Sequence, residues 1–275
     1  MALFSREISR EEEPPLHRGR AEPARACGKG GRLIVGAVSL IALIALWALA
    51  AWLAQSRHFP GPVAVGAAIG AGIGSGELPY HTAITLARVA ASFVVAFAIG
   101  SPIGIVLGRF GKLDLFFDSW LILFLNLPAL IVIILCFVWL GQNEAAAVTA
   151  VALNKIPNVA VILREGTQAM PPGYDEMATL YRFDWWTRLR HVHLPQLAPY
   201  FAVAARSGLA IVWKIVLIVE LLGLSSGVGF KLNMYFQSFD VTGILAYALS
   251  FIAVIFVIEA VLLRPWQTAA NRWRP

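Results

Sequence analysis

Residues 164–200 read REGTQAMPPGYDEMATLYRFDWWTRLRHVHLPQLAPY, a charged and aromatic stretch in a chain that is otherwise nearly continuous apolar helix. Loops of this length inside a compact domain usually carry function or structure of their own. Pro171-Pro172-Gly173 breaks the preceding helix, and Asp175 offers a capping side chain for a short helix that follows. Asp184 is placed to cap a second short helix, which Pro195 is expected to end. The sequence therefore predicts two short helices between the apolar segments, displaying the aromatic side chains of Tyr181, Phe183, Trp185 and Trp186.

Composition indicates a membrane protein. Of the 275 residues, 59% are hydrophobic and 14% are charged, and the mean hydropathy is +0.72. Because about a quarter of the residues in a soluble domain are charged, these values indicate several membrane-spanning segments. The formal net charge of +6 does not indicate a nucleic-acid partner, because the basic residues fall between apolar segments and form no single patch.

The sequence carries no sign of a metal centre or of hydrolytic chemistry. Cys27 lies in a polar tail and Cys136 in an apolar run, so the two cysteines give neither a disulfide nor a metal signature. His191 and His193 lie two residues apart without further ligands, which favours solvated side chains over a metal pair. The motifs HExxH, GxxxxGK[ST] and GxSxG do not occur in the sequence. We therefore expect this chain to bind no metal or cofactor and to catalyse no reaction.

Six segments are long and apolar enough to cross a hydrocarbon core of about 30 Å as helices. They are residues 33–53, 81–108, 115–141, 145–163, 199–222 and 243–263. The third is expected to kink near Pro128, and residues 154–158 (NKIPN) are expected to interrupt the fourth. Residues 63–73 are expected to form a small-residue helix at the outer membrane interface. Residues 223–240 are expected to form a glycine- and aromatic-containing connection.

The N-terminal region is a polar tail followed by the first apolar segment. Residues 1–32 mix basic and acidic side chains with proline and glycine, and we expect them to be disordered, leaving a membrane domain over residues 33–275. A cleavable signal peptide competes with a retained first span, because Ala48-Leu49-Ala50 resembles a cleavage site. The acidic cluster and the long leader favour the retained anchor.

Three glycines in the second segment repeat every fourth residue. Gly100, Gly104 and Gly108 form one smooth stripe on a helix, where another helix can approach closely. Patterns of this kind are also common by chance in membrane helices, so a true interface and a chance pattern remain equal alternatives. Pro102, within the same segment, is expected to bend it.

The distribution of basic residues predicts the orientation in the membrane. If the N-terminus is cytoplasmic, sixteen of the 22 lysines and arginines fall in cytoplasmic segments, and only Arg57 and Lys231 lie outside. This asymmetry satisfies the positive-inside rule and places both termini and the loop of residues 164–198 in the cytoplasm.

The loop also resembles a known motif. Glu176-Met177-Ala178, Arg182 and Val192-His193-Leu194-Pro195 match the spacing of the EAA-x3-G-x9-I-x-LP loop of permease subunits in binding-protein-dependent ABC importers. Met177 replaces an alanine of that motif and Arg182 replaces its glycine, which suggests a tightly helical or charge-contacting turn. Further segments resemble permeases of the nitrate/sulfonate/taurine/bicarbonate group, and the resemblance covers about residues 33–270. These segments include Phe59-Pro60-Gly61-Pro62, Gly76-Glu77-Leu78, Leu86-Ala87-Arg88-Val89, Gly100-Ser101-Pro102-Ile103-Gly104 and Glu220-Leu221-Leu222-Gly223.

The resemblance implies an all-α integral membrane protein of the bacterial inner membrane. It implies the type I ABC importer architecture, with six transmembrane helices and a cytoplasmic coupling helix between spans 4 and 5. Its partners would be two ATPase subunits that hold the ATP and Mg, a periplasmic or lipid-anchored substrate-binding protein, membrane lipid and a second permease copy. The residues expected to couple to the ATPase are Asp175, Glu176, Met177, Ala178, Tyr181, Arg182, Phe183, Trp185, Trp186, Leu194 and Pro195. By analogy within the group, the solute would be an oxyanion or sulfonate such as nitrate, taurine or an alkanesulfonate.

Two other functions remain open at the level of the sequence. A small heterocycle such as a vitamin precursor is an alternative solute, because specificity in such systems resides largely in the binding protein. A self-contained, ion-coupled secondary transporter is the rival class. It would usually show an internal repeat of spans, and none is visible between residues 33–141 and 144–263.

Several charged residues fall at or within apolar segments, where each is costly unless it is paired or hydrated. An inward-facing Lys214 or Arg206 would offset the dehydration of an anion in a translocation path, whereas snorkelling or pairing with another helix would explain either residue equally well. Glu220, before a glycine-rich connection, is a candidate for the outer gate. Arg88 is expected to be structural.

Overall fold

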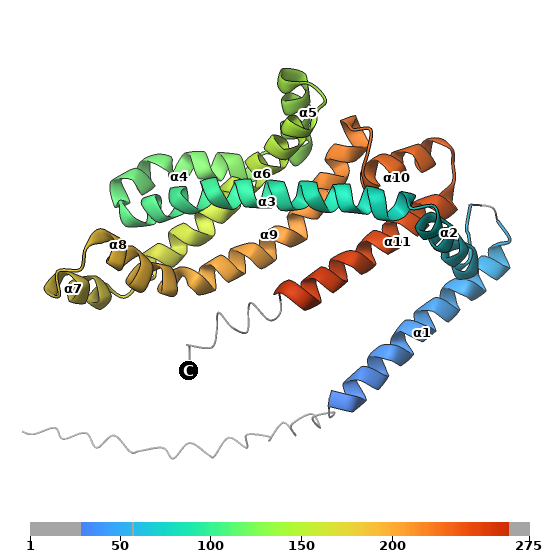
Figure 1. Ribbon diagram of the computed structural model, residues 1–275, viewed down its shortest axis with the longest axis horizontal. Helices are drawn as coiled ribbons and strands as arrows, with labels where there is room; N and C mark the ends of the chain where they lie inside the picture. The colour runs from blue at the N-terminus through green and yellow to red at the C-terminus, as the bar shows by residue number, and fades with distance from the viewer. Residues whose placement is uncertain (1–28, 57, 264–275) are drawn as a thin grey trace, which may run out of the picture. The chain divides into compact units, whose positions relative to one another are not determined.

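The computed structural model describes residues 29–56 and 58–263, and within these ranges every regular element is a helix (Figure 1). The helices are α1 Lys29–Ala54, α2 Pro62–Gly74, α3 Glu77–Arg109, α4 Gly111–Asn126, α5 Ala129–Leu140, α6 Glu144–Gln168, α7 Pro172–Leu180, α8 Trp185–Thr187, α9 Leu194–Gly223, α10 Val228–Gln237 and α11 Val241–Ile258. Two π-helical segments, η1 Arg188–His193 and η2 Glu259–Leu263, adjoin α9 and α11. The predicted disorder of residues 1–32 lies outside the described residues up to residue 28, and for residues 29–32 it is wrong, because they form the start of α1.

The chain forms two units, residues 1–47 and 48–275. The first unit contains most of α1, whose membrane-length segment Ile34–Ala54 buries none of its side chains. An apolar helix that buries none of its side chains suits a hydrocarbon surrounding. The second unit holds the other helices.

Five helical segments in the described residues are long and apolar enough to span a membrane. They are Ile34–Ala54, Glu77–Arg109, Glu144–Gln168, Trp185–Gly223 and Val241–Val261. The pair α4 and α5 supplies a sixth if it crosses as one broken span. The small-residue helix predicted over residues 63–73 is present as α2.

The predicted kink near Pro128 is a sharp break, because α4 and α5 are bent by 91°. Proline lacks an N–H and pushes the preceding residue into extended backbone, which is the conformation of Leu127 (φ −67°, ψ 125°). At the end of α4, Asn126 donates a side-chain hydrogen bond to the Ile122 carbonyl (2.7 Å).

The predicted interruption of the fourth segment at residues 154–158 is wrong. Helix α6 runs unbroken through Pro157, which is buried. A proline inside a helix removes only one backbone hydrogen bond, and neighbouring membrane helices can hold the backbone straight enough to tolerate this loss. Asn154 adds a bond from its side chain to the Ala150 carbonyl (2.9 Å), and the Lys155 amine bonds the Asn158 side chain within the same helix.

Two further boundaries differ from the sequence-based expectation. The connection 223–240 contains helix α10, which was not predicted because glycines at its start indicated a loop. Gly227 has φ +105°, and Gly229 lies against the carbonyl of Leu217. Helix α9 begins five residues before the predicted Pro199 and continues without a break from η1, so Pro195 lies inside the helical segment Trp185–Gly223. Pro195 therefore does not end the preceding helix as expected, and the backbone just before it is π-helical.

Helices α3 and α6 pack side by side (Figure 1). A Cβ added to Gly100 would lie 2.9 Å from the Ile156 carbonyl oxygen, and one added to Gly108 would lie 2.6 Å from the Thr167 Cβ. One added to Gly104 would overlap the Ala160 carbonyl oxygen. All three glycines therefore lie where the backbone of α6 comes too close for any side chain.

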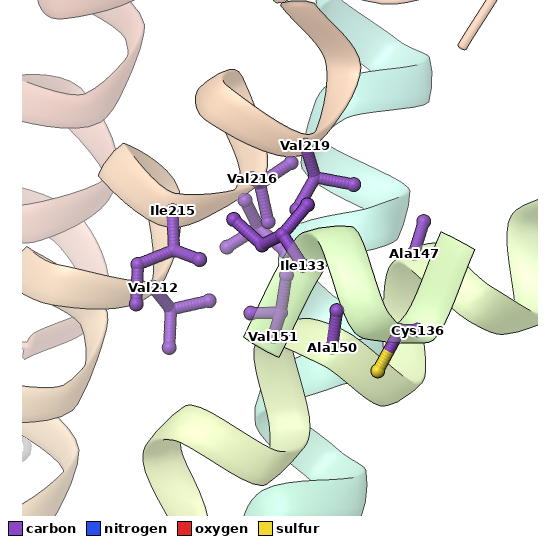
Figure 2. Close-up of a cluster of buried hydrophobic side chains, with 10 residues drawn as sticks. Ile133, Cys136, Ala147, Ala150, Val151, Val212, Ile215, Val216 and Val219 are labelled. Atoms are coloured by element: carbon purple, nitrogen blue, oxygen red, sulfur yellow. The ribbon is translucent and has the colours of Figure 1, made fainter. Parts of the chain in front are cut away.

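The apolar core forms where α5, α6 and α9 meet. Side chains of Ile133, Val151, Val216 and Val219 point toward one another there, with the thiol of Cys136 at the edge (Figure 2). A second cluster joins α3, α10 and α11 and comprises Leu78, Val228, Tyr247 and Phe251.

Candidate functional site

The loop between α6 and α9 displays one short helix with two distinct faces. Helix α7 starts at Pro172 and is preceded by Pro171 in extended backbone, so Asp175 lies in the first turn and does not cap the helix as predicted. Ala178 is fully buried on one face. The other face exposes Tyr174, Met177, Leu180 and Tyr181, the last with 68% of its surface accessible. An apolar face left open on a polar loop is a surface suited to a partner.

The turn after α7 contains Arg182, the residue that stands where the motif has glycine. Arg182 has φ +51°, the left-handed conformation that glycine adopts freely and that other residues adopt at a cost of about 1–2 kcal/mol. Its N–H donates to the Thr179 carbonyl (3.1 Å), and the Phe183 N–H donates to the Ala178 carbonyl (2.9 Å). Arg182 therefore takes up the left-handed turn that the motif's glycine would favour.

Asp184 caps the next short helix, as predicted. Its carboxylate accepts from the Thr187 N–H (3.4 Å), and hydrogen bonds from Thr187 hold the pKa of Asp184 below its ordinary value. The rings of Trp185 and Trp186 meet edge to face with centroids 5.3 Å apart, and 72% of Trp185 is accessible. Beside this pair, an open groove of about 770 Å³ runs along residues that include Phe110, Phe183 and Leu189.

The inner face of α7 is tied to its neighbours by polar contacts. The Asp175 carboxylate forms an ion pair with Arg109, the last residue of α3, and its second oxygen lies 3.5 Å from Nε2 of His193 in η1. The Thr179 hydroxyl donates to the Asp175 carbonyl (2.7 Å) and accepts from Nη2 of Arg188 (2.7 Å). Glu176 is exposed, as are Leu194 and Pro195.

A second polar site lies at the opposite end of α3. We call it the polar hub and define it as His81, Thr85, Arg88, Glu144, Glu220 and Ser226. Arg88 donates to Glu220 Oε1 (2.7 Å), to the Ser226 carbonyl (2.7 Å) and, through Nε, to Glu144 Oε2 (2.7 Å). Arg88 and Glu220 are both buried, whereas 65% of the Glu144 side chain is accessible.

The polar hub also satisfies the start of α10. The first N–H groups of a helix lack partners within it, and here three successive ones find side chains. Gly227 N–H donates to His81 Nδ1 (3.0 Å), Val228 N–H to Thr85 Oγ1 (2.8 Å), and Gly229 N–H to Glu220 Oε2 (2.8 Å). The polar hub thus joins α3, α6, α9 and α10 in one hydrogen-bonded network, and it confirms the structural role predicted for Arg88.

Comparisons with known proteins decide the family. A family model described as "Binding-protein-dependent transport system inner membrane component" matches residues 100–264. The chain belongs to this family. The resemblance drawn from the 176–195 motif is confirmed, and the chain is a permease subunit of an ABC importer and a multi-pass membrane protein.

Similar proteins agree with this assignment. The permease is 27% identical over 234 residues to a putative aliphatic sulfonates transport permease protein, SsuC, of Bacillus subtilis, covering 84% of each chain. It is 28% identical over 244 residues to the SsuC of Escherichia coli, covering 86% of this chain and 90% of the other. The bicarbonate transport system permease protein CmpB of Synechococcus elongatus is 27% identical over 198 residues, covering 70% and 68% of the two chains.

Solved structures agree in fold. An inward-facing structure of the MetNI methionine ABC transporter matches with a TM-score of 0.57 and 20% identity, covering 68% of this permease and 90% of that chain. This confirms the all-helical architecture of a type I importer permease.

The permease does not bring the three candidate path residues together. Lys214 and Arg206 are exposed on α9, and the Lys214 amine lies 5.5 Å from the centre of the Trp213 ring. Glu220 is buried in the polar hub, facing α3 and α10. Among the described residues, no group of three or more His, Cys, Asp or Glu side chains could hold a metal ion.

Sequence reasoning missed most of the polar hub. Only Arg88 and Glu220 were singled out, although His81, Thr85 and Arg88 recur at helical spacing within an apolar segment and so lie on one face. That polar stripe was a usable signal. Glu144 and Ser226 gave none, because their partners lie 56 and 138 residues away in the chain.

Proposed function

We propose that this permease carries a small oxyanion or organosulfonate across the bacterial inner membrane, driven by ATP that a separate subunit hydrolyses. The solute class is supported by relatives named for aliphatic sulfonates and for bicarbonate. A substrate-binding protein on the outer side, periplasmic or lipid-anchored, delivers the solute. The ATP and Mg belong to the ATPase, and this chain is not an enzyme.

The observation that carries the proposal is the two-sided helix α7. Its inner face is held by Arg109 and Arg188, while its apolar outer face is open. We infer that this outer face, extended by Trp185 and Trp186, inserts into a groove of the ATPase as the coupling helix. Short helices with aromatic anchors are a common way to fill such a groove.

The orientation follows from the same helix and from the basic residues. If α7 meets a cytoplasmic ATPase, both termini lie in the cytoplasm, and the polar hub lies at the outer end of the permease. The excess of lysine and arginine in the tail, in the 109–114 connection and in the loop agrees with this orientation. Alternating access would then arise when ATP-driven motion of α7 shifts the population between inward- and outward-open states.

The second copy completes the path. Helices α4 and α5 expose large apolar side chains such as Phe116, Trp120 and Trp139, and membrane lipid and a second permease copy are the partners we propose for them. Lys214 and Arg206, exposed on α9, are proposed to attract an anion in the path between the two copies.

Affinity purification of the tagged permease from its native membrane, followed by mass spectrometry, tests the proposal. We expect a stoichiometric ATPase that is lost when Tyr181, Trp185 and Trp186 are changed to alanine. A matched control changes Phe236, equally exposed at the opposite end, to alanine and should retain the ATPase. Preparations without ATPase in several mild detergents would contradict the proposal.

The solute is tested separately in proteoliposomes that contain the complex and its binding protein. We expect ATP-dependent uptake of radiolabelled taurine or nitrate, with competition by ethanesulfonate. Uptake of none of these anions by an assembled, ATP-hydrolysing complex would contradict the proposed solute class and leave the coupling role intact.

A further inference from the structure

We propose that the Arg109–Asp175 ion pair makes the coupling helix α7 move as one body with α3, so that these two residues transmit the motion of the ATPase to the outer end of the permease. They are positioning residues for transport and take no part in docking. This inference rests on the proposed function of α7.

The carboxylate of Asp175 pairs α7 with α3 and lies close to η1. One oxygen pairs with the guanidinium of Arg109 at the end of α3, and the other lies 3.5 Å from Nε2 of His193 in η1. Because Asp175 lies in the first turn of α7, any displacement of that helix acts directly on the end of α3. The side chain of Asp175 is 27% accessible and points inward, away from the exposed aromatic face.

A second contact, the hydrogen bond from Arg188 to Thr179, also joins α7 to η1. Asp175, Ala178 and Thr179 occupy one face of the helix because they are spaced by three and four residues. The Thr179 hydroxyl bonds both the Asp175 carbonyl and Arg188 of η1, each at 2.7 Å. Ala178, between the two ties, is fully buried. The inner face is therefore fixed at two points, and the outer face stays free for the ATPase.

The end of α3 leads to the opposite end of the permease. From Arg109 to Arg88 the helix runs 21 residues, or roughly 30 Å at 1.5 Å per residue. Along this length Gly100, Gly104 and Gly108 lie against the backbone of α6 with no room for a side chain. Tightly packed helices shift as units. Motion of Arg109 therefore reaches Arg88, where the polar hub links α3 to α9 and α10.

The pair itself contributes little to folding, which makes its role testable. Half of the Arg109 side chain is accessible, and partly exposed ion pairs have small effects on stability. Loss of the pair should therefore leave the permease folded and the ATPase bound, while the link between α7 and the end of α3 is weakened.

The test follows the outer end with a thiol. In a Cys27→Ser/Cys136→Ala background, Gln142→Cys places one reactive thiol in the exposed connection before α6. The complex with its ATPase is reconstituted in nanodiscs, and the rate of labelling by a membrane-impermeant maleimide is compared with and without ATP plus vanadate. We expect a clear nucleotide effect in this background.

Asp175→Asn and Arg109→Gln should each reduce the nucleotide effect at least about fivefold, the lower end of typical coupling between distant sites. The ATPase should remain bound in both variants. Lys112→Gln removes an exposed charge three residues from Arg109 and serves as the matched control, which should keep the full effect. The exchange Arg109→Asp/Asp175→Arg should restore it.

Each contrary result has a distinct meaning. A full nucleotide effect in Asp175→Asn with ATPase bound would overturn the inference, as would a background complex with bound ATPase and no effect at Gln142→Cys. Loss of ATPase from Asp175→Asn would assign Asp175 to docking, and an exchange that restores nothing would exclude the pair as the link. Absence of ATPase from the unmodified complex would refute the proposed function itself.

Discussion

Glu220→Gln tests the polar hub most directly, because the substitution preserves the shape of the side chain and removes only its charge and one acceptor. In the permease, Oε2 of Glu220 accepts from Thr85 (2.9 Å) and from the Gly229 N–H (2.8 Å), and Oε1 accepts from Arg88 (2.7 Å). A glutamine has one oxygen for these three donors. If that oxygen continues to accept hydrogen bonds from Thr85 and Gly229, the glutamine N–H₂ group faces the guanidinium of Arg88, and both groups are donors.

The expected loss of stability follows from these contacts. A charge-assisted hydrogen bond contributes about 1.5–3 kcal/mol, and a buried donor left without a partner costs about 1–3 kcal/mol. Removing one partner of a buried ion pair costs about 3–5 kcal/mol. Since Arg88 retains its ion pair with Glu144, we expect a loss at the lower end of that range, about 3 kcal/mol. For a chain of this size the loss corresponds to a fall in Tm of about 6–12 °C.

Thermal unfolding in detergent, followed by size-exclusion chromatography of the heated protein, measures this change. Glu144→Gln is the matched control because it weakens the same arginine, but at a side chain that is 65% accessible, where water can replace the lost hydrogen bond, so we expect a loss of about 1 kcal/mol. We expect its Tm to fall by no more than about 4 °C. Equal Tm values for Glu220→Gln and the unmodified permease, or an equal fall in both variants, would refute the reasoning that burial makes Glu220 the stronger partner.

Three further predictions concern packing, backbone strain and buried charge. Gly104→Ala should destabilise the permease by about 1–3 kcal/mol in the same assay, because its Cβ would overlap the Ala160 carbonyl oxygen. Gly70→Ala, with nothing within 4 Å of the added Cβ, should not be destabilising, and comparable losses would contradict the close approach of α3 and α6. Arg182→Gly should retain or raise the Tm, because Arg182 has φ +51°, a conformation that glycine adopts freely. Arg182→Val should lower stability by more than about 1 kcal/mol. An Arg182→Val protein of unchanged stability would count against the left-handed turn. Lys155→Met should retain or raise the Tm, because the buried amine has only Asn158 as a polar partner among the described residues and methionine removes its desolvation. A large fall in the Tm of Lys155→Met would reveal a stabilising partner for that amine.

Local chemistry explains which sequence-based expectations were correct. The cap at Asp184, the break near Pro128 and helix α2 depend on residues within one turn of each other, so the sequence contains their cause. The expectations for Pro157 and Pro195 were wrong because the effect of a proline on a helix depends on the surrounding structure. Inside α6 the neighbouring helices compensate for the lost hydrogen bond, and at Pro195 the helix continues from the π-helical turn of η1.

The departure at Arg182 shows a different limit. The sequence identified the position as one where the motif carries glycine, and it suggested a tight or charge-contacting turn. Only the backbone shows that Arg182 itself adopts φ +51°. A side chain in this conformation is uncommon, so residue type alone argues against it.

The sequence by itself determined that this permease is a helical membrane protein with a charged, aromatic loop, because hydropathy and helix breakers act over short distances along the chain. It also identified the family, through the spacing of residues 176–195. The tertiary structure alone decided that Asp175 meets Arg109 and that Arg88, Glu144, Glu220 and Ser226 form one network. These partners are separated by 56 to 138 residues in the chain. A charged residue in an apolar segment indicates only that it needs a partner. Which partner it finds depends on how the helices pack.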